Sequence, residues 1–165
     1  RGSRFDSHAM ALGAALSRTD IHVEMQGEGA ACSLNGLYLT GGRQHTDHHT
    51  RVDHLVPYCT SREYYRGVLD GRSRAVFNGK VVVHEQARKT DAQQSNANLL
   101  LSQHAEVDTK PELEIYDDDV KCAHGATIGQ MDMEQLFYLR SRGLGEVEAR
   151  NVLIFAFADD VLMRL

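Results

Sequence analysis

The chain has 165 residues, a net charge of −5 and an apolar content of 42%. This length is sufficient for one domain with a hydrophobic core, and the negative charge argues against a general nucleic-acid-binding surface. The sequence contains no apolar run long enough to span a bilayer, and its N-terminal residues lack the continuous apolar stretch of a signal peptide.

The cysteines and the first residue add two expectations. Cys32, Cys59 and Cys122 are odd in number and widely spaced, which argues against a disulfide framework. They favour a reducing compartment, and we expect a cytoplasmic protein. The chain does not begin with Met, so we expect it to be an internal fragment of a longer protein.

The first three quarters of the chain predict short β-strands. Within residues 19–25, the apolar Ile21, Val23 and Met25 alternate with polar residues, which is the pattern of a half-buried strand. Glycine, asparagine and proline separate or interrupt the later segments, and Asn78-Gly79 predicts a turn. These later strand-like segments are residues 32–40, 46–56, 62–69, 75–83, 96–101 and 112–116.

Many short strands are compatible with a sandwich, a barrel or a β-solenoid. The breaks between strands are irregularly spaced and residues 81–83 are apolar on both faces, which favours the solenoid. We therefore expect a mainly β fold in which parallel strand pairing dominates between Asp20 and His124. Asparagines recur at the expected turns, where their side chains could stack between coils: Asn35, Asn78, Asn96 and Asn98.

The sequence changes character at Gly129, where a first helix is predicted to follow. Asp132 is a suitable N-cap for a helix over residues 133–142. Gly143 is the expected residue immediately after the helix, because glycine adopts the left-handed conformation that commonly ends helices.

A second helix is predicted from about Glu146 to the end of the chain. Its centre, residues 152–158, is apolar on all sides, and a helix of this kind is buried on more than one side. We therefore expect two parts, a β-helix core over residues 1–128 and a helical domain over residues 129–165.

The histidine-rich segment HTDHHTRVDH is the first candidate for a metal site. On a strand, His45, Asp47 and His49 share one face, while His48 and His54 share the other. Two imidazoles and a carboxylate are suitable ligands for Zn²⁺ or Fe²⁺. However, three such ligands on one straight strand spread over roughly 13 Å, at about 3.3 Å per residue. This spacing favours a polar, solvated face with His–Asp hydrogen bonds.

The second candidate is KCAHG, where the acidic run before it ends and a strand is expected to end. Cys122 and His124 share one strand face, with Cα atoms about 7 Å apart. A thiolate and an imidazole are suitable ligands for thiophilic metals or an iron–sulfur species, but two ligands leave such a site incomplete. A site here would therefore be open or shared with a second chain. The alternative from the residues alone is a buried Cys122 that packs as a small hydrophobe and a His124 bonded to a carbonyl.

Several segments together resemble a known family. They occur in this order: SRAVFNGKVVV, KTDA, NANLLLS, TKPELEIYDDDVKCAHGATIG and FYLRSRG. In this order they resemble the C-terminal half of the SufB/SufD family, and the KCAHG form resembles its SufD branch. These proteins are scaffold subunits of the SUF iron–sulfur cluster assembly system. The resemblance implies a right-handed parallel β-helix followed by a helical domain, and it implies further family segments on both sides of this chain.

The resemblance also implies partners and a site. It implies a complex with SufB and with the ABC-type ATPase SufC. It implies that His124, with Cys122 beside it, lies near the SufB–SufD interface and takes part in nascent cluster assembly. The iron–sulfur cluster would then be transient and shared with SufB, and the participation of a flavin stays open.

The expected function is thus that of a non-enzymatic scaffold subunit. We expect Ile154, Phe157 and Val161 to form the SufC contact, because they wind onto a different face of the second helix from Leu153. One alternative is a metal-dependent β-helix enzyme that uses the face of His45, Asp47 and His49. The other is a purely structural subunit in which His124 is inert.

Overall fold

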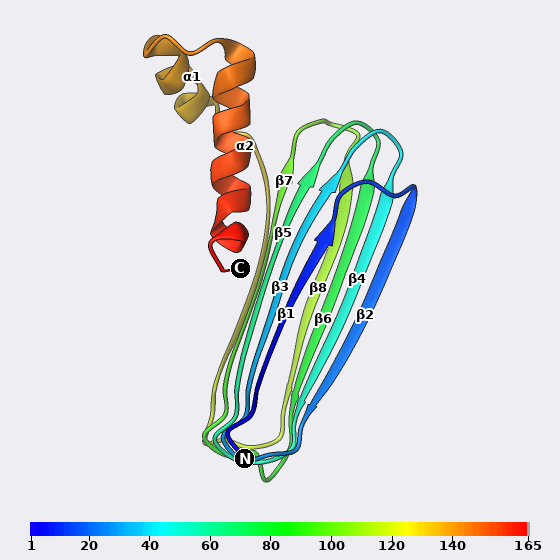
Figure 1. Ribbon diagram of the computed structural model, residues 1–165, viewed down its shortest axis with the longest axis vertical. Coiled ribbons are helices and arrows are strands. Elements are labelled where there is room, and N and C mark those ends of the chain that lie inside the picture. Colours follow the sequence, from blue (N-terminus) through cyan, green and yellow to red (C-terminus); the bar gives the residue numbers. More distant parts are fainter. Residues whose placement is uncertain (165) are drawn as a thin grey trace.

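The computed structural model describes residues 1–164, and within them the chain forms nine strands followed by two helices. Eight of the strands are ten residues long, which gives the molecule its elongated shape (Figure 1). The strands are β1 Arg4–Ala11, β2 Leu16–Met25, β3 Ala31–Thr40, β4 His45–His54, β5 Thr60–Leu69, β6 Arg74–Val83, β7 Asp91–Leu100, β8 Glu106–Ile115 and β9 Lys121–Gln130. The helices are α1 Met133–Ser141 and α2 Glu146–Leu162.

The strands form two parallel sheets that the chain enters alternately. One sheet has the order β1-β3-β5-β7-β9 and the other the order β2-β4-β6-β8. Each strand pairs in parallel with the strand two positions later in the chain, so the backbone winds as a solenoid of about four turns. Figure 1 shows the two sheets facing each other along the long axis. The prediction of a parallel β-helix, rather than a sandwich or a barrel, is therefore confirmed.

Side chains that alternate inward from both sheets fill the interior. The rings of Tyr38, His48, Tyr65 and Phe77 follow one another with centroid separations of 5.2, 5.5 and 4.8 Å. Tyr38 and Tyr65 lie on neighbouring strands β3 and β5, and a Cβ at Gly67 would overlap the Tyr38 ring. Glycine at this position therefore makes room for an aromatic ring from the adjacent coil.

The turn predicted at Asn78-Gly79 is wrong, because both residues lie inside strand β6. A Cβ at Gly79 would overlap the side chains of Gln94 and Phe77, so this glycine serves side-chain packing in the interior. The asparagines expected at turns are also within strands. Asn96 and Asn98 are buried, and the Asn98 amide donates to Asn96 Oδ1 at 2.7 Å. These two side chains therefore bond to each other within one coil, in the interior of the solenoid and not at its corners.

Helix α1 begins and ends where the sequence predicts. The side chain of Asp132 accepts hydrogen bonds from the backbone N–H groups of Glu134 and Gln135, and Gly143 has a φ of 97° just beyond the helix. Strand β9 continues to Gln130, so the boundary expected between residues 128 and 129 falls within the last strand.

Helix α2 lies along the outer face of the sheet that contains β3 and β5 (Figure 1). Ala158 and Val161 form a small buried cluster with Leu37 of β3. Arg66 of β5 adds an ion pair to Asp160, with 2.6 Å between Nη2 and Oδ2. Neither helix in the described part of the chain is long and apolar enough to cross a membrane.

Candidate functional site

Cys122 and His124 lie on β9, the last strand of the solenoid. The KCAHG segment begins this strand, so the expectation that it ends a strand is wrong. Strand β9 pairs with β7, which places Cys122 beside Ala92 and His124 beside Gln94. Cys122 packs against the main hydrophobic cluster, and His124 is two residues along the same strand. Both side chains therefore belong to the inward face of the last coil.

Cys122 is half-buried, which affects its chemistry. Burial raises the pKa of its thiol and is the largest effect; the Ala92 backbone lowers this pKa by less, and the Asp91 carboxylate adds a smaller increase. The side chain is therefore a neutral thiol at neutral pH in the isolated chain. It would need a metal ion or a partner's positive charge to become a thiolate ligand.

His124 is exposed, although it belongs to the inward face. Its strand has a neighbour, β7, along one edge, and among residues 1–164 no strand pairs with the other edge. An imidazole and a row of unpaired backbone groups are thus presented together. This is the arrangement that a second chain can extend by strand addition.

The histidine-rich strand β4 shows the predicted alternation of faces. Asp47 and His49 are on the outer face, where His49 Nε2 lies 2.8 Å from Asp47 Oδ1 and Arg18 donates to Asp47 Oδ2 at 2.7 Å. No group of three or more His, Cys, Asp or Glu side chains within residues 1–164 is arranged to hold a metal ion. His45 takes no part in this contact, and Asp47 Oδ1 makes no hydrogen bond within residues 1–164. The His–Asp hydrogen bonds of this polar face instead join His22 and His84 to Asp53.

His48 and His54 are on the inner face of β4 and are almost completely buried. Burial lowers the pKa of each imidazole to about 4. His54 Nε2 lies 2.9 Å from Ser61 Oγ, while His48 packs between Tyr38 and Tyr65. Both histidines are therefore neutral parts of the core at neutral pH.

Glu63 of β5 is a buried acid that the sequence interpretation missed. Its side chain is fully buried, and Thr50 Oγ1 donates to its Oε2 at 2.6 Å. Burial raises the pKa of Glu63 to about 7, because an ionised carboxylate is poorly solvated inside the solenoid. Glu63, Tyr65 and Leu69 are separated by even numbers of residues along the strand and so share one face. This shared face is the feature of the sequence that indicates a buried Glu63.

The raised pKa of Glu63 predicts that the contribution of this side chain to the stability of the folded state falls as the pH rises. Between the unfolded pKa of 4.5 and the folded pKa of about 7, the folded state binds more protons than the unfolded state. Replacing Glu63 by Gln should therefore change the free energy of unfolding more favourably at about pH 8 than at about pH 5. The difference between the changes at the two pH values should be roughly 3 kcal/mol at most. Urea unfolding of both proteins at the two pH values measures this difference. An equal effect at both values would contradict it.

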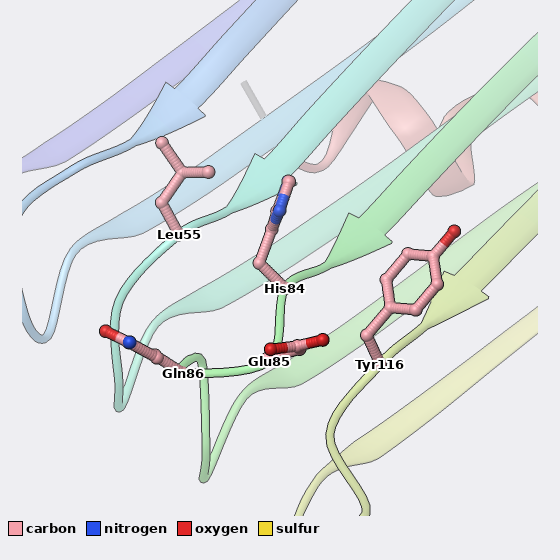
Figure 2. A pocket seen from close by; sticks show the side chains of 5 residues that line it. All are labelled: Leu55, His84, Glu85, Gln86 and Tyr116. Atoms are coloured by element: carbon pink, nitrogen blue, oxygen red, sulfur yellow. The ribbon is translucent and has the colours of Figure 1, made fainter.

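A hollow of about 440 Å³ lies where strands β4, β6 and β8 end, and its lining contains none of the predicted site residues. Figure 2 shows Leu55, His84 and Tyr116 beside one another just after these strands. His84 Nε2 lies 3.2 Å from Oδ1 of the buried Asp53. The guanidinium of Arg51 and this contact hold the pKa of Asp53 well below its usual range. His84 is thus hydrogen-bonded to a carboxylate that also forms an ion pair with Arg51.

The helices present an exposed apolar surface that differs from the expected one. Val161, expected at the surface, is only 2% exposed because it packs on the solenoid. Phe157 is half-buried with the Arg66 guanidinium 6.0 Å from its ring, and Ile154 is also half-buried. A groove of about 520 Å³ between the helices is lined by residues that include Tyr138 and Val152. We call Tyr138, Val152 and Phe155 the helical surface, since all three are exposed and Phe155 follows Val152 by one helical turn.

The comparison with known families decides the family of this solenoid. The family model described as SUF system FeS cluster assembly, SufBD core domain, matches residues 1–157 of this chain. The chain belongs to the SufBD family. The resemblance seen in the ordered segments from SRAVFNGKVVV to FYLRSRG is thereby confirmed, and the SufBD family is assigned to iron–sulfur cluster assembly.

Individual SufBD relatives agree with this assignment. The iron–sulfur cluster assembly protein SufD of Escherichia coli is 44% identical over 155 residues, which cover 94% of this chain and 37% of that protein. An iron–sulfur cluster assembly SufBD family protein of Synechocystis is 42% identical over 160 residues, 97% of this chain and 35% of that protein. SufD of Bacillus subtilis is 30% identical over 141 residues, 86% of this chain and 32% of that protein. The chain thus spans about a third of the length of these relatives.

Proposed function

We propose that this SufBD chain belongs to a non-enzymatic scaffold subunit that assembles iron–sulfur clusters together with SufB and the ATPase SufC. The observation that carries the proposal is the exposed imidazole of His124 beside the unpaired edge of the last strand. The cluster is cargo in this proposal, bound transiently and passed on. The three free cysteines are compatible with a reducing cytoplasm as the place of action.

His124 has the properties of a ligand that a second subunit completes. An iron–sulfur cluster is usually held by four protein ligands, whereas this strand supplies one imidazole and one half-buried thiol, that of Cys122. A SufB strand added to the free edge of β9 would bring further ligands next to His124. The partner would also satisfy the unpaired backbone groups of that edge.

Cluster content tests the shared site. The intact protein purified alone under oxygen-free conditions should contain no stoichiometric iron and sulfide, because its two donors leave a cluster site incomplete. The same protein co-purified with SufB and SufC should contain both elements after cluster assembly. Stoichiometric iron and sulfide in the isolated protein would contradict the shared site.

The helical surface is the proposed contact for SufC. An exposed apolar patch beside a groove is typical of a protein-binding surface, and Phe155, one of the three residues of this surface, is 62% exposed. Replacing Phe155 by Asp places a charge in the desolvated contact and should reduce SufC recovery in a pull-down by more than about tenfold. Helix α2 should keep its place on the solenoid, because its contacts with Leu37 and Arg66 lie on another face.

The control for this experiment is Leu16→Asp, which adds the same charge at an exposed apolar position on the solenoid. Leu16 is 68% exposed, so SufC recovery should be unchanged. Phe157→Asp is a second comparison, because this half-buried residue lies beside Arg66 and tests the surface expected from sequence. Normal SufC recovery with Phe155→Asp, or equal losses with Phe155→Asp and Leu16→Asp, would argue against this surface.

A further inference from the structure

Three polar side chains form a column that runs from the interior of the solenoid to His124. In the parallel pairing of the strands, Glu63 of β5 is beside Gln94 of β7, and Gln94 is beside His124 of β9. Glu63 and Gln94 are 0% and 3% exposed, and all three side chains belong to the inward face. Adjacent strands are about 4.8 Å apart, so the column spans three successive coils.

The buried part of this column has unused hydrogen-bonding groups. Glu63 Oε1 and both amide atoms of Gln94 are buried and have no protein hydrogen-bond partner within residues 1–164. The Gln94 amide nevertheless lies close enough to Glu63 to lower its pKa against the larger effect of burial. Gly79 lies on the opposite side of the interior, and its lack of a side chain makes room for the Gln94 amide. Buried polar groups are normally paired, so this amide is expected to bond the groups above and below it.

We propose that Gln94 and Glu63 are positioning residues for His124, and that the orientation of the Gln94 amide selects the tautomer of the His124 imidazole. The proposal rests on the proposed function only in assigning His124 as a ligand. Histidine ligands usually donate their second ring N–H to a group behind them, which fixes the tautomer and leaves the other nitrogen free to bind metal. In the register of the strands, Gln94 is the residue of β7 beside His124, so its amide is the buried group available for this role.

The protonation state of Glu63 would set the orientation of the amide. An ionised Glu63 can only accept hydrogen bonds, so the Gln94 NH₂ group turns toward it and the amide oxygen faces His124. That oxygen accepts an imidazole N–H and leaves the remaining nitrogen with its lone pair. A neutral Glu63 donates to the amide oxygen, so the NH₂ group faces His124 and favours the other tautomer.

Other titratable groups that interact with Glu63 stay neutral in this range. They are the Cys32 thiol of β3, whose pKa burial raises to about 12, and the Tyr65 hydroxyl of β5, whose pKa burial also raises. Burial raises the pKa of Glu63 itself to about 7. The column therefore contains one buried acid that changes charge near neutral pH.

Long-range ¹H–¹⁵N correlation spectra of the histidine side chains in the intact protein test the proposal. His124 is assigned by its loss in His124→Ala, and its tautomer ratio is followed through neutral pH. The ratio should change by about two- to tenfold as Glu63 ionises, which is the effect of one hydrogen bond. The change should be absent in Glu63→Gln and in Gln94→Met, while the exposed His104 should be the same in all three proteins.

The proposal is overturned if His124 has the same tautomer ratio in the wild-type protein and in the two variants at every pH. If Glu63→Gln does not fold, the wild-type protein and Gln94→Met decide the question by themselves. The outcome is separate from the test of cluster assembly, because the spectra report on the imidazole without iron or a partner. Normal assembly by His124→Ala would reject the ligand role and leave the measured tautomer effect standing.

Discussion

Replacing His124 by Ala should almost abolish iron–sulfur cluster assembly while the solenoid stays folded. The side chain is exposed on the last strand, so its removal creates no cavity in the core. Loss of a group behind a metal ligand typically costs about 10- to 100-fold, and loss of the ligand itself should cost at least as much. The measurement is the rate of cluster formation by the complex with SufB and SufC, with complex recovery measured in parallel.

His104→Ala is the matched control, because it removes another exposed imidazole from the same chain. Cluster assembly by this variant should equal that of the wild-type protein. If His124→Ala assembled clusters at the wild-type rate within an intact complex, the imidazole would be inert. The purely structural alternative, in which only the interface of this subunit matters, would then be the better description.

Replacing Gly67 by Ala should strongly destabilise the solenoid. A Cβ on Gly67 would overlap the ring of Tyr38 and the amide oxygen of Asn98, both of which are buried. Tyr38 donates its hydroxyl to this same Asn98 oxygen, so neither group can move without losing a buried hydrogen bond. We expect a loss of about 3 kcal/mol or more in the free energy of unfolding, at the upper end of the range for overpacking.

Gly129→Ala is the matched control for this substitution. Gly129 is also a strand glycine, and a Cβ at its position would have no heavy atom within 4 Å. Its effect on stability should be within about 0.5 kcal/mol. Denaturant unfolding of the three proteins compares these values, and similar losses for both variants would show that the Tyr38 contact does not determine the cost.

The type of fold was predictable because residues 81–83 are apolar on both faces and because the ordered segments resemble the SufB/SufD family. Alternation over residues 19–25 predicted β2, and the alternation of faces along β4 separated His48 and His54 from His49. Strand β1 was missed, because its side chains are mostly exposed and give little contrast between faces. Asn78-Gly79 wrongly predicts a turn, since the Gln94 side chain that fills the space beside Gly79 comes from another coil.

The candidate site was predictable only in part. The KCAHG motif identified Cys122 and His124, but the column below His124 depends on the register of three strands, which the sequence does not reveal. Glu63 shares the strand face of Tyr65 and Leu69, but the complete burial of its carboxyl group depends on the neighbouring coils. Similarly, an apolar helix does not disclose which side folds back onto Leu37, so the expectation that Val161 lies at the surface is wrong.

The one-sided pairing of β9 has a consequence for how the site becomes ordered. In a stack of coils, each coil is held only by its nearest neighbours, so local stability depends on how many neighbours it has. Strand β9 has one such neighbour, β7, among the described strands. Its amides should therefore exchange with solvent faster than those of β5, which is enclosed by β3 and β7. A docking subunit would slow this exchange, so the imidazole of His124 would become rigid only in the assembled complex. Recognition of the partner and construction of the cluster site would then be one cooperative transition.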